Sequence, residues 1–289
     1  RLAEVDVALF DKTGTLTLGE PVPQLDHLTT YQTSVALALA RSSRHPLSKG
    51  ITKMFEAEGI VPATLSELRE ETGLGILARS GDTPVALVRP QNAGDHIATS
   101  LQIGDENINV AFIDPLREDA AEALAALDRE GVGASIVSGD RVGPVEAIAT
   151  KLGISAQAEL LPDAKLRLLE GLRSEGYRPL MVGDGINDGP ALAAAHASIA
   201  PGSASDVSQQ AADAVFLGKT LMPVAMAVRV ARKTMVIVRQ NFAFAITYNV
   251  FAVPLALAGM VTPLIAAVAM SLSSLVVVGN SLRLAKAAQ

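Results

Sequence analysis

The sequence predicts an α/β protein, in which a parallel-sheet domain is interrupted by an inserted α+β domain and followed by two transmembrane helices. Three observations lead to this prediction. Short apolar runs alternate with helical patterns over most of residues 1–220, as is typical of parallel strands joined by right-handed helical crossovers. Residues 20–112 break that alternation with short segments separated by glycines. Two long uncharged stretches then fill residues 242–280.

The composition excludes several classes of protein. The chain of 289 residues carries a net charge of -6, which argues against a nucleic-acid-binding protein, because phosphate contacts need clustered positive charge. Its lack of cysteine excludes a disulfide framework, a Cys-ligated zinc site and a Cys nucleophile within these residues. The length is typical of roughly two domains. Since the chain begins at Arg1 without a signal-peptide pattern, we expect it to be part of a longer protein.

Three apolar runs predict the buried strands of the parallel-sheet domain, which we assign to residues 1–19 and 113–220. The runs are residues 5–10, 133–137 and 179–182. Helical patterns alternate with them at residues 118–130, 144–152, 163–174 and 189–195. Each strand ends in a short turn rich in Gly and Asp. Because ligands of open α/β sheets bind beyond the carboxyl ends of the strands, we expect these turns to form one site.

The inserted domain is predicted over residues 20–112. It contains two helical patterns, at residues 34–41 and 46–58, followed by short strand-like segments between glycines. This mixture indicates a separate α+β domain. The chain then returns to complete the parallel-sheet domain.

The C-terminal region, residues 221–289, is predicted to form a basic juxtamembrane helix and two transmembrane helices. Its two long stretches contain no charged side chain, and about 20 apolar residues cross a bilayer as a helix. Basic residues lie only at the outer ends of this hairpin: Arg229, Arg232, Lys233, Arg239, Arg283 and Lys286. By the positive-inside rule, both ends and both preceding domains are cytoplasmic, in a multi-pass protein of the cell membrane. The alternative, a buried hairpin of a soluble protein, seldom has two such stretches.

The turn after the first strand carries a candidate nucleophile. Asp11 stands where a buried strand meets a glycine turn. A carboxylate in this position can attack a phosphoryl group, with backbone N–H groups and Lys12 close to the incoming charge. Because an isolated Asp beside a glycine is more often a turn or helix-capping residue, the assignment depends on the other turns.

The remaining turns supply groups that match a phosphoryl-transfer site. Phosphate oxygens can be bound by the hydroxyl and N–H groups of Ser138, Gly139 and Asp140. Lys165, which opens a helix, can neutralise developing negative charge. An octahedral, all-oxygen Mg²⁺ site can be formed by Asp184, Asn187 and Asp188. The order of nucleophile, hydroxyl, lysine and acidic loop indicates one site rather than unrelated turns.

These motifs resemble those of P-type ATPases, which belong to the haloacid-dehalogenase-like phosphotransferase superfamily. Residues 11–17, Asp-Lys-Thr-Gly-Thr-Leu-Thr, match the family's phosphorylation motif, and residues 183–188 match its Gly-Asp-Gly-x-Asn-Asp loop. The resemblance covers nearly the whole chain. It implies that Asp11 accepts the γ-phosphoryl group of ATP, with Lys165 and Ser138 holding the phosphate. It also implies a Mg²⁺ site formed by Asp11, the main chain of Thr13, Asp184 and Asp188, with Asn187 supporting the loop.

Thr13 distinguishes a pump from a soluble phosphatase of this superfamily. Such phosphatases usually carry a second Asp two places after the nucleophile as a general acid and base, and this chain has Thr13 there. General acid–base help is worth roughly 10²–10⁴-fold, so we expect water to attack the acyl phosphate slowly. Pumps of the family hydrolyse it with a Thr-Gly-Glu loop of another domain, a sequence that this chain lacks.

The inserted domain resembles the nucleotide-binding domain of heavy-metal-transporting P-type ATPases, the IB class. In that class a His-Pro pair contacts the adenine, which implies this role for His45, although the usual Glu before it is Arg44 here. Gly73 and Gly75 resemble the class's Gly-x-Gly loop, where the missing side chain lets the backbone approach a ligand. Residues 114–117 resemble the D-x-x-R motif at the re-entry to the phosphorylation domain. Its arginine is expected to pair with the phosphate or with the motif's own aspartate.

Polar residues within the two spans resemble the metal site of copper(I)-transporting IB pumps. Polar groups inside a bilayer usually face a pathway or the bundle interior, although Ser and Met there also serve packing. The resemblance implies a site formed by Tyr248, Asn249, Met270 and Ser274. Copper(I) is soft and favours thioether ligands such as Met270. The family's Cys-Pro-Cys ligands are absent from this chain.

The leading hypothesis is therefore a copper(I)-exporting P-type ATPase that uses ATP and Mg²⁺, with the lipid bilayer and a copper chaperone as partners. One alternative keeps the pump and changes the ion to zinc or cadmium, but neither span carries a carboxylate, and zinc prefers harder ligands. A second alternative is a membrane-anchored haloacid-dehalogenase-like phosphatase. A third is a non-enzymatic chain that binds nucleotide. Rapid metal-independent turnover of small phosphate esters would favour the phosphatase, and ATP binding without a phosphoenzyme would favour the non-enzymatic chain.

Overall fold

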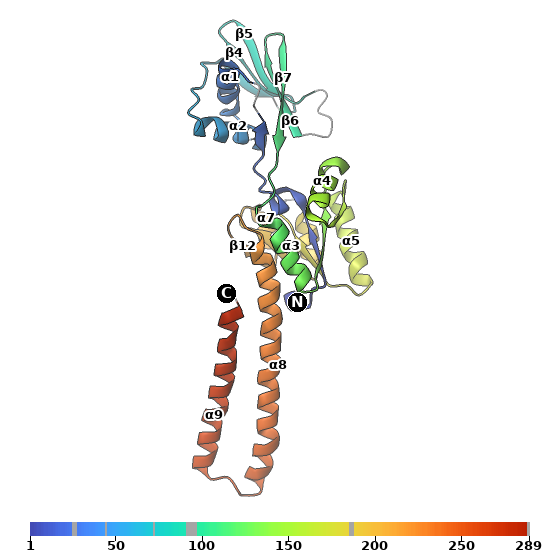
Figure 1. Cartoon of the computed structure of the whole chain (residues 1–289), viewed down its shortest axis with the longest axis vertical. Coiled ribbons are helices and arrows are strands. Elements are labelled where there is room, and N and C mark those ends of the chain that lie inside the picture. The colour runs from blue at the N-terminus through green and yellow to red at the C-terminus, as the bar shows by residue number, and fades with distance from the viewer. Residues whose placement is uncertain (25–27, 44, 72, 91–96, 185–187, 288–289) are drawn as a thin grey trace.

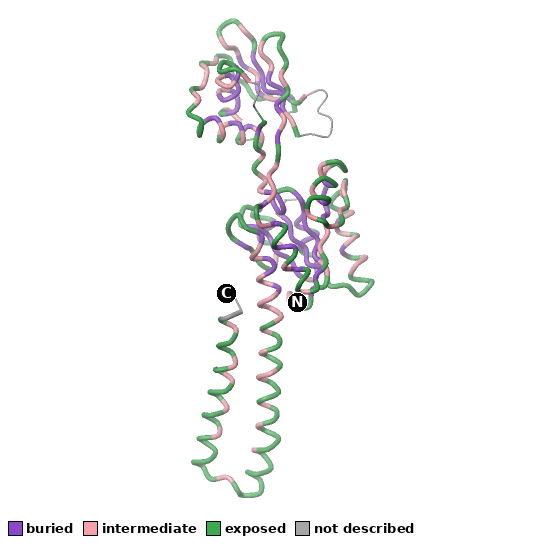
Figure 2. The backbone as a smooth tube through the Cα atoms, in the orientation of Figure 1, coloured by how far each residue is buried: buried purple, intermediate pink, exposed green. Residues whose placement is uncertain are grey.

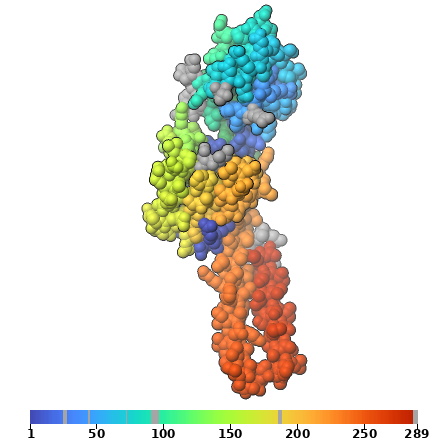
Figure 3. Space-filling view, turned by 180° about the vertical axis from the view of Figure 1, so that it is seen from behind, coloured from blue at the N-terminus to red at the C-terminus, as the bar shows by residue number. Residues whose placement is uncertain are grey.

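The computed structural model describes residues 1–24, 28–43, 45–71, 73–90, 97–184 and 188–287. Three parts follow one another along the long axis of the molecule: an antiparallel-sheet unit, a parallel-sheet unit and a helical hairpin (Figure 1). The space-filling view from behind has the same order (Figure 3). The chain begins in the parallel-sheet unit, builds the antiparallel-sheet unit and then returns, so the antiparallel-sheet unit is an insertion.

The parallel-sheet unit is built on six strands in the order β12-β11-β10-β1-β8-β9, all of them parallel. They are β1 (Val7–Phe10), β8 (Gly133–Val137), β9 (Ser155–Gln157), β10 (Pro179–Val182), β11 (Ala197–Pro201) and β12 (Ala214–Phe216). The predicted parallel α/β class is confirmed, and β8 and β10 lie at the predicted residues. β1 lies between β10 and β8, so the first strand ends near the middle of the sheet edge.

Helices cover both faces of this sheet: α3 (Ala120–Arg129), α4 (Val142–Leu152), α5 (Pro162–Ser174), α6 (Gly189–Ala194) and α7 (Asp206–Ala211). Successive residues of a strand point to opposite faces, and β1 therefore contributes to two cores. Ala8 and Phe10 pack in a core with α3 and α4, whereas Leu9 packs in one with α5 and α6. A sheet buried on both faces needs nearly continuous apolar strands, which explains the runs that predicted it.

The antiparallel-sheet unit has six strands in the order β2-β7-β6-β5-β4-β3. They are β2 (Val22–Gln24), β3 (Ser66–Glu71), β4 (Gly75–Ser80), β5 (Thr83–Val88), β6 (Ile97–Ile103) and β7 (Glu106–Ile113). Two helices, α1 (Thr30–Ala40) and α2 (Pro46–Ala57), share one apolar core with this sheet. α1 begins earlier than predicted, because Thr29 and Gln32 form a capping box at its start.

Two chain segments connect the units, and hydrogen bonds tie these segments together. The carboxylate of Asp114 accepts hydrogen bonds from the hydroxyl of Thr17 at 2.5 Å and from the N–H of Gly19 at 3.0 Å. The guanidinium of Arg117 donates to the carbonyl oxygen of Thr15 at 2.7 Å. Within the described residues, Arg117 and Asp114 form no ion pair with each other, contrary to one of the two expectations, because each binds the segment that leaves β1.

α8 (Met222–Leu257) and α9 (Pro263–Leu282) form the helical hairpin, and both are long and apolar enough to cross a membrane. α8 is continuous over 36 residues, so the predicted juxtamembrane helix and first span are one helix. Figure 2 shows α8 passing from a part buried against the parallel-sheet unit to an exposed remainder. Among the described residues, η1 (Leu2–Glu4) and η4 (Arg283–Ala287) are short helical segments, and η2 (Lys12–Leu16) is a tight turn with a non-helical backbone at Thr13 and Gly14.

Contacts at both ends of α3 fix the first turns of α8 to the parallel-sheet unit. At one end, the carboxylate of Asp119 accepts a hydrogen bond from the N–H of Met222 at 2.7 Å. At the other end, the guanidinium of Arg232 donates to the carbonyl oxygens of Glu130 and of Val5, the latter at 2.7 Å. The carboxylate satisfies N–H groups that a helix start leaves without partners. The first part of α8 is therefore held beside α3 along its length.

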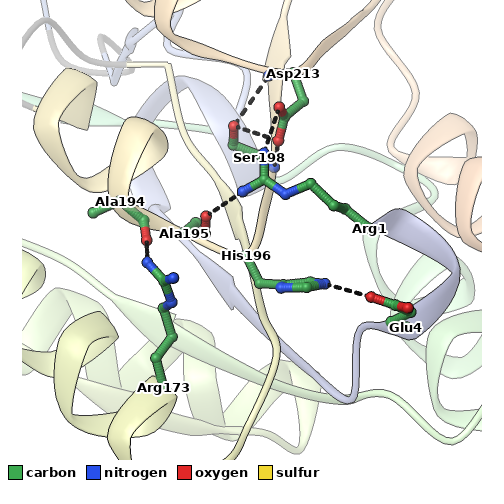
Figure 4. A network of polar contacts seen from close by, with 8 residues as sticks. All are labelled: Arg1, Glu4, Arg173, Ala194, Ala195, His196, Ser198 and Asp213. Atoms are coloured by element: carbon green, nitrogen blue, oxygen red, sulfur yellow. Dashed lines mark hydrogen bonds and ion pairs between the residues drawn. The ribbon is translucent and has the colours of Figure 1, made fainter.

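A polar network closes the amino edge of the parallel sheet (Figure 4). The guanidinium of Arg1 lies 3.2 Å from the carboxylate of Asp213 and donates to the carbonyl oxygen of Ala195 at 2.9 Å. The ring of His196 lies 3.1 Å from the carboxylate of Glu4. These contacts hold the segment before β1 against β11. The opposite, carboxyl edge of the sheet carries the turns that the sequence singled out.

Candidate active site

Asp11 lies directly beyond the carboxyl end of β1, between the ends of β8 and β10. Its N–H donates to the carbonyl oxygen of Val182, the last residue of β10, at 2.8 Å. Asp11 is only 8% exposed, so little water screens its carboxylate. The parallel sheet thus brings the turns after β1 and β10 together, as expected for strands that end at one edge.

The turn η2 places the backbone of Gly14 against Asp184. Gly14 has a φ of 72°, a left-handed conformation that glycine adopts at little cost. A Cβ at this position would collide with the carboxylate of Asp184. Glycine in the phosphorylation motif therefore lets the acidic turn after β10 approach the turn that carries Asp11.

Lys165, in the first turn of α5, bridges two carboxylates. Its Nζ lies 2.6 Å from Oδ1 of Asp11 and 2.7 Å from Oδ1 of Asp188. Asp184 offers a third carboxylate, and one oxygen from each aspartate lies within 4.8 Å of the others. One lysine does not balance three ionised carboxylates. Oxygen donors with excess negative charge, next to a candidate phosphoryl acceptor, fit a Mg²⁺ ion.

The pKa values of the cluster reflect this crowding of buried charge. Burial, together with Asp188, raises the pKa of Asp11 to about 6, although Lys165 acts in the opposite direction. Burial and the charges of Asp11 and Asp188 raise the pKa of Asp184 to about 7. Burial opposes the charge of Lys165, but Asp11 and Asp188 leave its pKa raised. A divalent cation would relieve the repulsion among the carboxylates, so the charge of the site also fits a bound metal.

Lys12 and Thr13 both contact the turn after β8. Nζ of Lys12 lies 2.7 Å from Oδ2 of Asp140, and the hydroxyl of Thr13 donates to the same oxygen at 3.1 Å. The N–H of Asp140 in turn donates to the hydroxyl oxygen of Ser138 at 3.2 Å. The turns after β1 and β8 are therefore joined through the carboxylate of Asp140.

Most of the predicted residues come together at this edge of the sheet, on the turns after β1, β8 and β10 and on α5: Asp11, Lys12, Thr13, Ser138, Gly139, Asp140, Lys165, Asp184 and Asp188. Asn187, and Arg44 of the nucleotide motif, lie outside the described residues.

Sequence reasoning named Thr17, Asp114 and Arg117 within motifs but did not predict that they support the turn η2 from the side of the connecting segments. The guanidinium of Arg117 is 3% exposed and donates to the carbonyl oxygen of Gly14 at 3.0 Å. Thr17 and Asp114 hold the end of the same turn. The available signals were the last threonine of the phosphorylation motif and the D-x-x-R motif. Neither signal reveals which backbone groups the side chains bind.

A second candidate site lies on the antiparallel-sheet unit, in a cavity of about 720 Å³. Its lining includes three predicted residues, His45, Gly73 and Gly75. Nδ1 of His45 accepts a hydrogen bond from the N–H of Leu47 at 3.3 Å and so caps α2. Gly75 has a φ of 139°, and a Cβ there would collide with the carbonyl oxygen of Leu87. Only glycine therefore lets β4 begin this close to β5.

The four predicted metal-site residues lie in the hairpin, with Tyr248 and Asn249 on α8 and Met270 and Ser274 on α9. The side-chain amide of Asn249 donates to the carbonyl oxygen of Ala245 in its own helix at 2.9 Å. Met270 is 65% exposed. Within the described part of the chain, no hydrogen bond joins two of the four, so they are present as separate side chains.

Comparison with known proteins identifies the family. The model of the haloacid dehalogenase-like hydrolases matches residues 5–196, which include the turns that carry Asp11, Asp140 and Asp184. The chain belongs to this haloacid dehalogenase-like hydrolase family. Within it, the similar proteins are P-type cation-transporting ATPases, which confirms the resemblance that the motifs indicated.

Three similar proteins define this subgroup. The nitrogen fixation protein FixI of Rhizobium leguminosarum bv. viciae is 45% identical over 98% of this chain and 39% of its own length. A copper-exporting P-type ATPase of Vibrio cholerae serotype O1 is 33% identical over 98% of this chain and 34% of its own length. A solved zinc-transporting PIB-type ATPase in its E2.Pi state superimposes with a TM-score of 0.80 at 30% identity, over 98% of this chain and 50% of that one. The chain thus spans well under half the length of these sequence relatives.

Proposed function

We propose that this chain belongs to an ATP-driven pump for a heavy-metal cation, in which Asp11 is transiently phosphorylated. The proposal is carried by the arrangement around Asp11, a buried carboxylate at the carboxyl edge of the sheet with Lys165 at 2.6 Å and Asp184 and Asp188 beside it. The similarity to P-type ATPases supports it. In the whole protein we expect the antiparallel-sheet and parallel-sheet units to be cytoplasmic and the hairpin to be part of a multi-pass membrane domain.

In the proposed chemical step, a carboxylate oxygen of Asp11 attacks the γ-phosphorus of ATP. A bond forms between that oxygen and phosphorus, the bond from phosphorus to the bridging oxygen of ADP breaks, and ADP leaves with the electron pair. Lys165 offsets the negative charge that gathers on the transferred group. The residues that would hold Mg²⁺ are Asp11, the main chain of Thr13, Asp184 and Asp188. Bound there, Mg²⁺ supplies further neutralisation of the phosphoryl oxygens.

The turns after β1 and β8 position the rest of the site. Asp140 joins Lys12 and Thr13, and we expect the backbone N–H groups of the two turns to bind phosphate oxygens. The hydroxyl of Thr13 is already donated to Asp140, and Thr13 has no carboxylate with which to activate water. The aspartyl phosphate is therefore expected to last long enough for a conformational change.

ATP reaches this edge from the second candidate site. We assign its adenine to the cavity with His45, Gly73 and Gly75. The two chain segments at Thr17–Gly19 and Asp114 are the connection about which the two units would close. Because the first part of α8 is held at both ends of α3, we expect movement of the parallel-sheet unit to be transmitted directly to α8.

The transported ion that we propose is copper(I). Met270 supplies a soft thioether, and Tyr248, Asn249 and Ser274 are the other candidate ligands on the hairpin. The solved relative that transports zinc keeps zinc as the second candidate. A copper chaperone is the expected donor of a soft ion. Metal stimulation of ATP hydrolysis, compared between Met270→Ala and the loop variant Met260→Ala, separates the two: copper stimulation lost only in Met270→Ala supports copper, and zinc stimulation in the natural protein supports zinc.

The proposed function is tested by phosphorylation with γ-labelled ATP in membranes that contain the natural protein carrying this chain. The account predicts label that survives acid, is released by hydroxylamine and is absent from Asp11→Asn. Label that persists in Asp11→Asn would refute the assignment.

A further inference from the structure

The cavity on the antiparallel-sheet unit has an apolar floor and a polar rim. Ile76 and Leu87 line the floor and are at most 4% exposed. Ser43, His45 and Glu70 line the rim. A flat, mostly apolar ring with a polar edge fits such a slot, because its faces need no hydrogen bonds and its edge does. The rim therefore decides which ring is bound.

Glu70 lies on the cavity side of β3. It pairs with Ile76 across the β3–β4 ladder, and paired residues share a face of the sheet. The next residue, Glu71, pairs with Gly75 and also lines the cavity, but its carboxylate lies 3.1 Å from the guanidinium of Arg69. The two neighbouring glutamates thus differ in charge compensation: Glu71 has a cationic partner among the described residues, and Glu70 has none.

Ser43 fixes the carboxylate of Glu70 at the rim. The hydroxyl of Ser43 donates to Oε1 of Glu70 at 2.6 Å and accepts a hydrogen bond from the N–H of His45 at 3.1 Å. His45 is itself held by its contact with Leu47 at the start of α2. No further hydrogen bond or ion pair from the described residues reaches Glu70. Its second oxygen, Oε2, is therefore an acceptor at the edge of the cavity that no described residue uses.

One free acceptor oxygen distinguishes the two purine bases. Adenine presents a single exocyclic amino group on its six-membered ring. Guanine presents two adjacent donors, N1–H and N2–H, which suit both oxygens of one carboxylate, and a carbonyl oxygen that a carboxylate repels. The hydrogen bond from Ser43 occupies one lone pair of Oε1, so Oε2 is the more available acceptor, and a single acceptor matches adenine better than guanine.

We infer that Glu70 is a base-selecting residue that accepts a hydrogen bond from the exocyclic amino group of adenine. This inference rests on the proposed function, in which the cavity binds ATP. It adds a specificity determinant that the His-Pro and Gly-x-Gly motifs do not contain.

The test removes the side chain of Glu70 and the amino group of the ligand, singly and together, so that their interaction is measured separately from other effects. ATP and purine riboside triphosphate, which lacks the amino group, are titrated calorimetrically into the whole chain in detergent. Glu70→Ala is expected to weaken ATP binding roughly three- to tenfold, the effect of about one net hydrogen bond, and to leave purine riboside triphosphate binding unchanged. Glu67→Ala, an exposed glutamate of the same strand outside the cavity lining, is the matched control and is expected to change neither.

The outcomes separate this inference from the proposed function. ATP binding by the natural chain, with an equal loss for both ligands or no loss in Glu70→Ala, would overturn the role of Glu70 and leave the nucleotide site intact. No binding of either ligand by the natural chain would overturn both.

Ser43→Ala supplies a second variant on the same carboxylate. Released from Ser43, Glu70 has two free oxygens, and the preference for ATP over GTP is expected to fall; an unchanged preference would contradict the inference.

Discussion

The two candidate sites differ in how far their charged side chains are buried. At the carboxyl edge of the parallel sheet, Asp11, Lys165 and Asp188 are 8%, 6% and 3% exposed. In the cavity of the antiparallel-sheet unit, Glu70 and His45 are exposed. A buried charge without a partner is costly, whereas an exposed one is solvated. We therefore expect single substitutions to have large effects at the first site and graded effects at the second.

The difference follows from the two sheets. The parallel sheet is covered on both faces, so the turns at its carboxyl edge are drawn into the unit together with their charged residues. The antiparallel sheet has its helices on one face, and its cavity opens at the rim of that face. Chemistry that needs unscreened charge suits the first environment, and reversible recognition of a nucleotide suits the second.

The largest effect is expected from Lys165→Met, because it leaves Asp11 and Asp188 buried without their shared cation. Phosphoenzyme formation from ATP is expected to fall roughly 10²–10³-fold. Arg167→Met, an exposed position on the same helix, is the control and is expected to retain the natural rate. If the two variants behave alike, burial does not set the importance of a charge here, and the comparison between the sites fails.

At the cavity of the antiparallel-sheet unit, Gly75→Ala tests packing rather than charge. The added Cβ would meet the carbonyl oxygen of Leu87, so the free energy of unfolding of the antiparallel-sheet unit is expected to fall by about 2–4 kcal/mol. Gly73→Ala has open space and bears only the strain of its left-handed φ, about 1 kcal/mol. Chemical denaturation of both variants provides the measurement, and equal losses would contradict the close approach of β4 and β5.

The attachment of α8 is expected to be intermediate in strength. Asp119→Ala removes the carboxylate that accepts from Leu221 and Met222 and is expected to cost about 1–2 kcal/mol. Asp128→Ala, exposed on α3, is the control and should stay within about 0.5 kcal/mol of the natural chain. Thermal melting of the purified chain measures both. If Asp119→Ala leaves the melting temperature unchanged, apolar packing alone holds α8 to this unit.

The smallest expected effect is a pH dependence of stabilisation by Mg²⁺. The raised pKa values of Asp11, about 6, and Asp184, about 7, mean that the folded chain binds more protons than the unfolded chain above the ordinary carboxyl range. Without metal, stability is therefore expected to fall as the pH rises through these values. Mg²⁺ competes with these protons, so it should raise the melting temperature by a few degrees more at about pH 8 than at about pH 5.5. A pH-independent shift would place Mg²⁺ elsewhere.

The fold was predictable where local sequence and burial agree. The apolar runs of β8 and β10 are bounded by Gly, Pro and turn residues, and both strands appear at the predicted positions. β11 and β12 were missed because they are short and follow one another without a long helical pattern. The single helix α8 was predicted as two segments because its charges end where its apolar stretch begins. No residue within it actually breaks the helix.

The sequence predicted which residues form the site, but not which of these residues contact one another. The motifs named Asp11, Lys165 and the acidic turn, since a parallel sheet collects the turns after its strands. That Lys12 pairs with Asp140 depends on the geometry of two turns far apart in the chain. Glu70 lies in a strand with many charged residues, and its orientation follows from the register with β4, which the sequence does not reveal.

The central claim, that Asp11 carries the phosphoryl group, is tested most directly by locating the acyl phosphate. Borohydride reduces an aspartyl phosphate to homoserine, and mass spectrometry of the peptides that contain the phosphorylation motif and the acidic turn then identifies the modified position. After incubation with ATP and Mg²⁺, the account predicts homoserine at position 11, and none when ATP is omitted. Homoserine at position 184 or 188 instead, with Asp11 unchanged, would contradict it.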